Sequence, residues 1–203
     1  IRNNHDSIRE YICNFIMSTL ETNLVQPSTG TTLTLGASGD TIDIPSGVTL
    51  DTTGATITGA LTNTPNFRAH RGSTQTISSG TTTKIQFDTE QWDTDGKYDN
   101  SSNYRFTPGS IGYYYLYSTL YVSTLGDQNF ANLVIRENGS TDLTYTRFLG
   151  SGTGGRSMLT ETTVYVDNVA DYFEVYLYNS VGCDVTSSSG AYSYFGGYKL
   201  IGV

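Results

Sequence analysis

Residues 112–122 read GYYYLYSTLYV and carry the strongest signal of fold class in the chain. Side chains of a β-strand point alternately to its two faces, so one face receives four tyrosines, while the other receives Tyr114 with leucine and valine. A strand that packs on a core from one side normally has a polar outer face. Large residues on both faces therefore predict a second buried surface beyond the core of one chain.

Two later stretches, 172–178 and 192–203, show the same pattern of large residues on both faces. Tyrosine suits a subunit contact because it buries a large area while its hydroxyl keeps a hydrogen bond. We favour subunit association, with a carbohydrate-stacking platform and ordinary half-exposed tyrosines as alternatives. The predicted subunit interface in these strands consists of Tyr113, Tyr115, Tyr117, Tyr121, Tyr176, Tyr178, Tyr194 and Tyr198.

Strand patterns recur throughout residues 65–203, and turn dipeptides such as Pro108-Gly109 and Asn138-Gly139 separate them. No helical pattern interrupts this series, so the region predicts one all-β domain, a sandwich or jelly roll. The predicted strands are Gln75–Ser78, Thr82–Phe87, Tyr104–Thr107, Gly112–Val122, Asn129–Arg136, Thr141–Leu149, Ser157–Val166, Tyr172–Asn179 and Tyr192–Ile201.

The composition agrees with an all-β chain that is poor in charge. Among 203 residues only 15% are charged, where about 25% is typical, and the net charge is −8. Lysine and arginine are absent between Arg9 and Arg68, so nucleic acid is not an expected partner. No apolar run reaches the length of a membrane span, so we expect no membrane insertion. Cys13 and Cys183 lie far apart in the sequence, and we expect both to be free thiols.

Residues 1–26 carry the only convincing helical pattern. Ser7 and Glu10 have the spacing of a capping box, and Pro27 marks the end of the pattern. We expect a short helix that trimerises or anchors the chain to other proteins. Met17 is a second candidate start, which leaves open whether residues 1–16 belong to the native protein. The apolar positions expected to anchor this helix are Ile8, Ile12, Phe15 and Ile16.

Residues 27–64 are rich in threonine and glycine, and short pieces with alternating apolar residues end at glycine turns. One such chain cannot bury enough apolar area to offset the entropy of ordering it, but several copies wound together can share a thin core. We therefore expect an intertwined β-stem, with a flexible linker as the alternative. The stem positions expected at the interface are Leu33, Leu35, Ile42 and Ile44.

Residues 65–203 resemble the C1q/TNF-like jelly-roll domain. The aromatic series runs through Phe87, Trp92, Asp99, Phe106, Pro108 and 112–116, and the closing stretch 194–200 (YFGGYKL) is similar to the family's last strand. Leu116 and Ser118 depart from the family's preference for aromatic residues at their positions. The resemblance implies a ten-stranded jelly roll that forms a tight trimer about a three-fold axis.

The stretch 32–47, TLTLGASGDTIDIPSG, ahead of such a head resembles fibre proteins of tailed bacteriophages, particularly marine ones. That resemblance implies a homotrimer on the exterior of a virion, made in the host cytoplasm. Its N-terminal part would bind other virion proteins, and its head would bind a host-surface receptor, glycan above all. Two alternatives stay open: a capsid decoration or head-fibre protein without receptor binding, and a cellular C1q-like lectin.

Catalytic motifs are missing from the sequence. The only histidines are His5 and His70, and we find no nucleophile elbow, phosphate loop or zinc spacing, so we do not expect an enzyme. His70, between two arginines, is expected to be a structural contact where stem and head join.

A short acidic segment is the one place that suggests a bound ligand. Asp93, Asp95 and Asp99 either supply oxygens to calcium or form a solvated turn, and calcium is the only cofactor considered. Trp92 and Tyr98 flank the segment and are the candidate sugar-stacking pair.

Overall fold

A computed structural model describes residues 30–32, 34–35, 37–51, 53–54, 62–123, 125–152, 154–187 and 192–202. Contacts divide the chain into residues 1–57 and 58–203. The helix expected over 1–26, with its four anchoring residues, lies outside the described residues, and so does Leu33.

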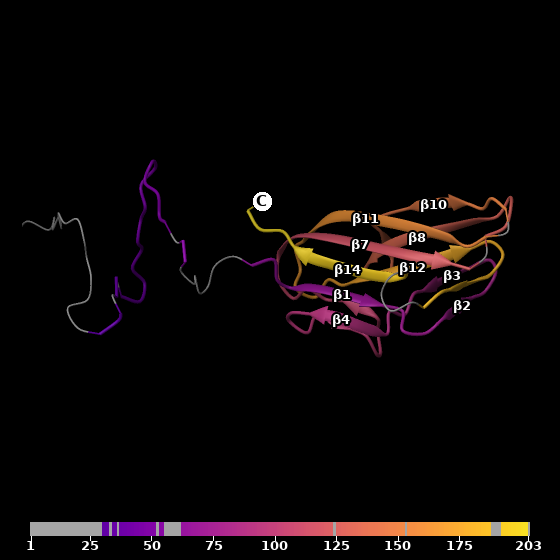
Figure 1. Cartoon of the computed structure of the whole chain (residues 1–203), viewed down its shortest axis with the longest axis horizontal. Coiled ribbons are helices and arrows are strands. Elements are labelled where there is room, and N and C mark those ends of the chain that lie inside the picture. Colours follow the sequence, from indigo (N-terminus) through magenta and orange to yellow (C-terminus); the bar gives the residue numbers. More distant parts are fainter. Residues whose placement is uncertain are drawn as a thin grey trace, which may run out of the picture. The chain divides into compact units, whose positions relative to one another are not determined.

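Two antiparallel sheets make up the second unit, with fourteen strands in its described residues. Five of the seven strands of sheet A lie one below the other in Figure 1. They are β11 (Arg156–Val166), β7 (Gly112–Val122), β14 (Tyr194–Lys199), β1 (Asn66–His70) and β4 (Thr89–Asp93). The short strands β13 (Cys183–Val185) and β2 (Gln75–Ile77) extend the same sheet beyond the end of β7.

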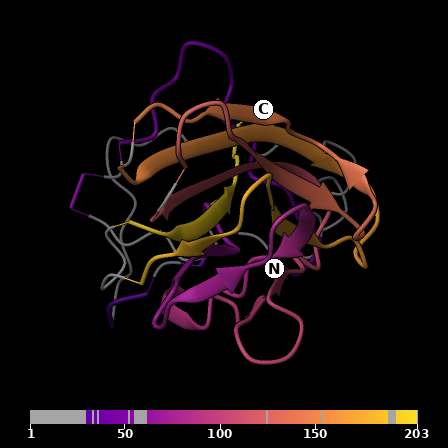
Figure 2. The same ribbon diagram turned by 90° about the vertical axis from the view of Figure 1, so that its right-hand side faces the viewer.

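Sheet B packs behind sheet A, and Figure 2 views the two layers from one end. Its strands run in the order β10 (Thr146–Leu149), β8 (Phe130–Glu137), β12 (Phe173–Asn179), β6 (Arg105–Phe106) and β5 (Tyr98–Asp99). Two further strands join it: β3 (Thr81–Lys84) pairs with β12, and β9 (Thr141–Asp142) pairs with β8.

The alternation that the sequence predicted in 112–122 is confirmed. Tyr114, Leu116, Leu120 and Val122 are fully buried, whereas the odd-numbered tyrosines stay partly exposed. These buried side chains face sheet B and help to form one continuous core between the sheets. The all-β prediction is therefore correct for the described part of the chain.

Aromatic rings fill the end of the core near β1. Phe67 stacks on Phe106 and Tyr98, with ring centroids 4.3 and 4.9 Å away, and Phe195 meets it edge-on at 5.0 Å. All four rings are buried. Because strands of both sheets supply them, this cluster joins the two layers.

Two adjacent glycines of β14 allow close packing on both of its faces. A Cβ at Gly196 would lie 2.5 Å from Cζ of Tyr117, and one at Gly197 would lie 2.6 Å from Cδ2 of Leu116. Contacts this short are not tolerated, so only glycine lets Tyr117 lie across the outer face of β14 while Leu116 packs beneath it.

The described residues of 30–54 contain turns and no strand. The Asp40 amide donates to the Ala37 carbonyl, and the Val48 amide donates to the Pro45 carbonyl. Leu35, Ile42 and Ile44 are 61%, 57% and 43% exposed. A single copy of this segment thus leaves its apolar residues in water. Within the described residues no helix is long and apolar enough to cross a membrane.

Candidate functional site

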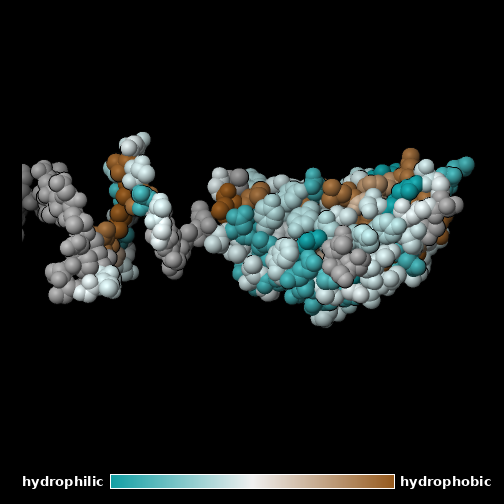
Figure 3. Space-filling model, viewed as in Figure 1, coloured by the Kyte–Doolittle hydropathy of each residue, from teal (hydrophilic) through white to brown (hydrophobic). Residues whose placement is uncertain are grey.

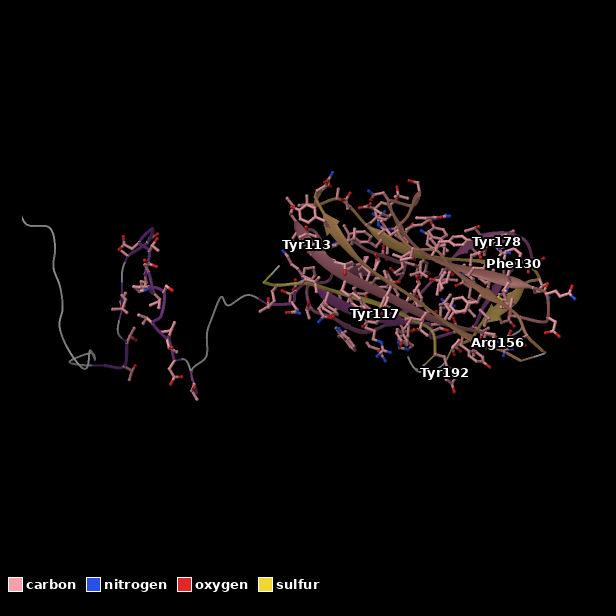
Figure 4. All side chains as sticks on the ribbon, turned by 90° about the horizontal axis from the view of Figure 1, so that it is seen from above. Tyr113, Tyr117, Phe130, Arg156, Tyr178 and Tyr192 are labelled. Atoms are coloured by element: carbon pink, nitrogen blue, oxygen red, sulfur yellow. The ribbon has the colours of Figure 1, made fainter. Side chains whose placement is uncertain are left out.

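The outer face of sheet A carries several groups of tyrosine rings, which we together call the tyrosine face. Figure 4 labels Tyr117 and Tyr192 from this face. Neighbouring rings have centroids 4.9 to 6.1 Å apart, across β11, β7 and β14. Its members are Tyr113, Tyr115, Tyr117 and Tyr121 of β7, Tyr194 and Tyr198 of β14, Tyr165 of β11, and Tyr192.

The strand register explains this arrangement. Gly196 lies opposite Tyr117, and Tyr198 lies opposite Tyr115, so residues of equal parity on β7 and β14 point the same way. Tyr165 of β11 lies opposite Tyr113 in the same manner. The sequence predicted the β7 and β14 tyrosines separately, and the pairing of the strands brings them together.

Two phenols of the tyrosine face have raised pKa values. The Tyr115 hydroxyl donates a hydrogen bond to Glu161 of β11, and this bond with the carboxylate raises the pKa of Tyr115 to about 12. Burial raises the pKa of Tyr117. At neutral pH these hydroxyls therefore remain hydrogen-bond donors.

One guanidinium lies at the lower side of the face. Arg68 of β1 is 4.0 Å from the ring centroid of Tyr194 and 5.9 Å from that of Trp92, so it lies near two aromatic rings. Trp92 is 43% exposed and donates from Nε1 to the Asn66 side chain. Figure 3 views the molecule from this side, and the face is mostly pale, as the near-neutral hydropathy of tyrosine requires.

The structure places Tyr176 and Tyr178 apart from the other tyrosines of the predicted interface. Both belong to β12 of sheet B, and their rings lie on the outer face of that sheet. Figure 4 shows Tyr178 beside Phe130 on one side of the sandwich, with Tyr117 and Tyr192 on the other. A trimer about a three-fold axis uses two different patches of each subunit, so the part of Tyr176 and Tyr178 in an interface stays a prediction.

The sugar-stacking pair Trp92 and Tyr98 is also wrong. Tyr98 is 5% exposed, stacks on Phe67 in the core, and donates its hydroxyl to the Phe87 carbonyl. A ring held in this way has no free face for a sugar, although Trp92 itself is exposed.

Two of the three aspartates accept backbone amides of their own segment. Asp93 accepts the amide of Tyr98 at 2.7 Å, and Asp99 accepts the amides of Ser101, Ser102 and Asn103. Those backbone hydrogen bonds hold the pKa of Asp99 well below its usual range. Among the described residues no three side chains of His, Cys, Asp or Glu gather as metal ligands. These hydrogen bonds are those expected of a turn, and calcium binding at this segment stays a prediction.

His70 is a residue of sheet A. It lies in β1 between Tyr194 of β14 and Thr89 of β4 and is 9% exposed. Cys183 is a buried free thiol whose pKa is raised by burial, whereas Cys13 lies outside the described residues.

A cavity on the outer face of sheet B escaped the sequence analysis. It has a volume of about 330 Å³ and lies over β8, between β12 and β10. We call it the sheet-B cavity. Its lining comes from five strands, β3, β8, β9, β10 and β12, and from the loop that holds Tyr145. Because β3 and β12 are distant in sequence from the others, no local motif marks it. The lining includes Phe130, Asn132, Arg136, Tyr145, Arg147 and Tyr178.

Two antiparallel sheets with this strand order, closed over an aromatic core, define a jelly-roll sandwich of the TNF/C1q kind. Three solved structures with this fold are similar to the chain, each at 12% identity. The Eiger TNF from S. frugiperda covers 68% of this chain and 92% of its own, with a TM-score of 0.52. Murine APRIL covers 66% and 98%, also with a TM-score of 0.52.

The globular domain of zebrafish complement 1qA protein covers 67% of this chain and 97% of its own, with a TM-score of 0.50. At this identity the similarities establish the fold alone. No protein-family model matches the chain, and no curated protein matches it in sequence.

Proposed function

We propose that the protein is a homotrimeric fibre or receptor-binding protein on the exterior of a virion, of the kind found in tailed bacteriophages. Its head attaches to a host surface, glycan above all, by binding without catalysis. Three equivalent weak sites on one trimer raise avidity through effective concentration. The tyrosine face is the observation that carries this proposal, because it supplies the surface on which three heads associate.

The trimer follows from the character of the tyrosine face. Aromatic rings enriched on one half-exposed face are typical of protein interfaces and uncommon on a free surface. Tyrosine rings of β7 and β14 pack against each other and are already restrained. Little side-chain entropy is therefore lost when a second subunit covers them. The three similar solved structures share the jelly-roll fold with this chain, and they support the proposed trimer through that fold alone.

The segment before the head supports assembly independently. Leu35, Ile42 and Ile44 are exposed in a single copy. Copies of the chain that wind together would bury these side chains in a shared core, as the alternating sequence predicts. In the proposed protein, residues 1–26 would then bind other virion proteins, and the head would lie at the distal end.

The oligomeric state is tested on the full chain. One chain has a mass of 22.1 kDa, so we expect about 66 kDa by light scattering after size-exclusion chromatography. Tyr117→Arg places a charge in the tyrosine face and should shift the mass toward that of one chain. Leu149→Arg is the matched control, since Leu149 is 71% exposed on β10 of the other sheet. A wild-type monomer at micromolar concentration would overturn the proposal.

Attachment is tested by competition. Purified trimer added before phage should reduce adsorption to host cells, and the monomeric Tyr117→Arg variant should compete far less. A trimer that fails to compete would instead favour a capsid decoration or head-fibre protein. The fold shared with the complement 1qA globular domain favours a cellular C1q-like lectin as the second candidate. Glycan binding without any competition for phage adsorption would support that candidate.

A further inference from the structure

The sheet-B cavity is built on one row of residues that crosses four strands. Thr82 of β3 lies opposite Tyr178 of β12, Tyr178 lies opposite Asn132 of β8, and Asn132 lies opposite Arg147 of β10. All four line the cavity. Because they sit on paired strands of one sheet, their spacing is fixed before any ligand binds.

Arg147 is held by an aromatic ring and has unused donors. Its guanidinium lies 3.7 Å from the ring centroid of Phe130, and Phe130 in turn stacks on Tyr178 at 5.5 Å. Within the described residues, no hydrogen bond or ion pair occupies its N–H groups. A guanidinium fixed in this way presents a planar set of donors, the geometry that matches a carboxylate.

Asn132 supplies a polar group without a partner. Its Oδ1 atom is buried and accepts no hydrogen bond in the described structure. Buried acceptors are rarely left unsatisfied, because each costs free energy unless something donates to it. The Asn132 side chain lines the cavity, so a rotation of its amide group would turn this acceptor toward a ligand hydroxyl.

One of the cationic side chains around the cavity has no carboxylate partner among the described residues. Arg136 forms an ion pair with Asp142 and lies over Tyr176 at 4.6 Å, so its charge is compensated. Lys84 is paired with Glu174, 2.6 Å away on the same face. Arg147 is the cation of this group that has no carboxylate partner. In a chain of net charge −8, one such guanidinium selects a single carboxylate and not a polyanion.

Aromatic rings complete the lining. Tyr145 is 61% exposed, and Tyr178 presents its ring beside Asn132. Aromatic faces pack against the apolar C–H face of a pyranose, while amide and guanidinium groups bind its oxygens. A cavity of this volume suits about one or two sugar rings.

From this arrangement we propose that the sheet-B cavity binds an acidic sugar of a surface glycan, with Arg147 on its carboxylate and Asn132 on a ring hydroxyl. Tyr178 and Tyr145 form the stacking walls. The inference rests on the proposed attachment function and names the ligand class and the site for it. It places the ligand on the sheet opposite the tyrosine face, so three sites stay open in a trimer.

The test compares two sugar probes that differ at one carbon and adds acetate as a third probe. Methyl β-glucuronide carries a carboxylate where methyl β-glucoside carries a hydroxymethyl group, and acetate supplies a carboxylate without a sugar. Titrations followed by saturation-transfer NMR on the full chain should show tighter binding of the glucuronide than of either other probe. Arg147→Gln should weaken glucuronide binding about tenfold, as loss of a charge-assisted hydrogen bond does.

Three further variants locate the site. Asn132→Asp puts a like charge beside the carboxylate and should remove glucuronide binding while leaving the glucoside unaffected. Asp142→Asn frees the Arg136 charge and should strengthen glucuronide binding. Arg105→Gln is the matched control, because Arg105 lies 4.2 Å over Tyr172 outside the cavity, and it should change nothing.

Some results would overturn the inference. The first is equal binding of glucuronide and acetate. The second is glucuronide binding that Arg147→Gln leaves unchanged, and the third is glucuronide binding that Arg105→Gln weakens instead. A site that reads only carboxylates would point to an acidic peptide. The variants should keep the mass of the wild type, which shows that they fold and assemble. A trimer that blocks phage adsorption but ignores the glucuronide refutes this site alone, whereas a monomer that binds the glucuronide refutes the proposed trimer alone.

Discussion

Replacing Gly197 by alanine should destabilise the head, whereas the same change at the adjacent Gly196 should alter its surface. The two residues lie side by side in β14, and their missing side chains point to opposite faces. At Gly197 a new Cβ would lie 2.6 Å from Cδ2 of Leu116 and 3.2 Å from Cε1 of Phe67, both fully buried. At Gly196 it would meet the ring of Tyr117 on the partly exposed side.

The packing of the two sites sets the size of each effect. Overfilling a dense core costs about 1–3 kcal/mol, and alanine recovers about 0.5–1 kcal/mol over glycine in a strand. The net loss for Gly197→Ala is then about 1–2 kcal/mol, since neither Leu116 nor Phe67 has room to withdraw. Tyr117 can turn outward, so Gly196→Ala should stay within about 1 kcal/mol of the wild type and weaken the proposed trimer instead.

Urea unfolding followed by near-ultraviolet circular dichroism measures both changes. The stability of an assembled protein depends on protomer concentration, so each variant is compared at two concentrations together with its mass. Gly197→Ala should lower the midpoint equally at both concentrations. Equal losses for the two variants, or a larger intrinsic loss for Gly196→Ala, would refute the assignment of the two glycines to core and surface.

Three other substitutions probe separate parts of the head. Phe67→Ala removes the ring shared by the two sheets and should cost about 3–5 kcal/mol in urea unfolding, and a loss under 1 kcal/mol would contradict its place in the core. Backbone hydrogen bonds lower the pKa of Asp99, so its contribution to the free energy of unfolding is present above the usual aspartate pKa and is lost as the pH falls below about 4. Asp99→Asn should cost about 1 kcal/mol at pH 7, a value kept small by solvent screening, and should reduce the loss of stability at acid pH. Glu161→Gln should lower the pKa of Tyr115 from about 12 toward 10 in an ultraviolet titration of the phenols, and an unchanged titration would show that Tyr115 does not donate to Glu161.

Local alternation was enough to predict the fold class and the faces of β7. The pattern in 112–122 requires a strand, and burial of Tyr114 but not Tyr113 follows from its period. Strand β1 escaped prediction because Arg68 and His70 interrupt a short run that reads as a polar junction. In the structure Arg68 lies over the Tyr194 ring, a contact that becomes apparent only after β1 and β14 are paired.

The sites were harder to predict because they depend on pairing between distant strands. Tyr176 and Tyr178 have the same local pattern as Tyr194 and Tyr198, yet β12 and β14 belong to different sheets. A sequence pattern tells which residues share a face of one strand, but not which sheet receives that strand. The sheet-B cavity shows the same limit, since Thr82 and Arg147 meet only through β12 and β8.

The place of β14 also affects how the head is made in the cell. This strand lies between β7 and β1 in the middle of sheet A, although it comes last in sequence among the strands of the described residues. Sheet A therefore cannot close on the ribosome until residues 194–199 have been synthesised and released. A chain cut short by even its last strand leaves two central strand edges unpaired and Phe67 without its partner Phe195. Such a truncated chain also lacks Tyr194 and Tyr198, so it cannot present the complete tyrosine face.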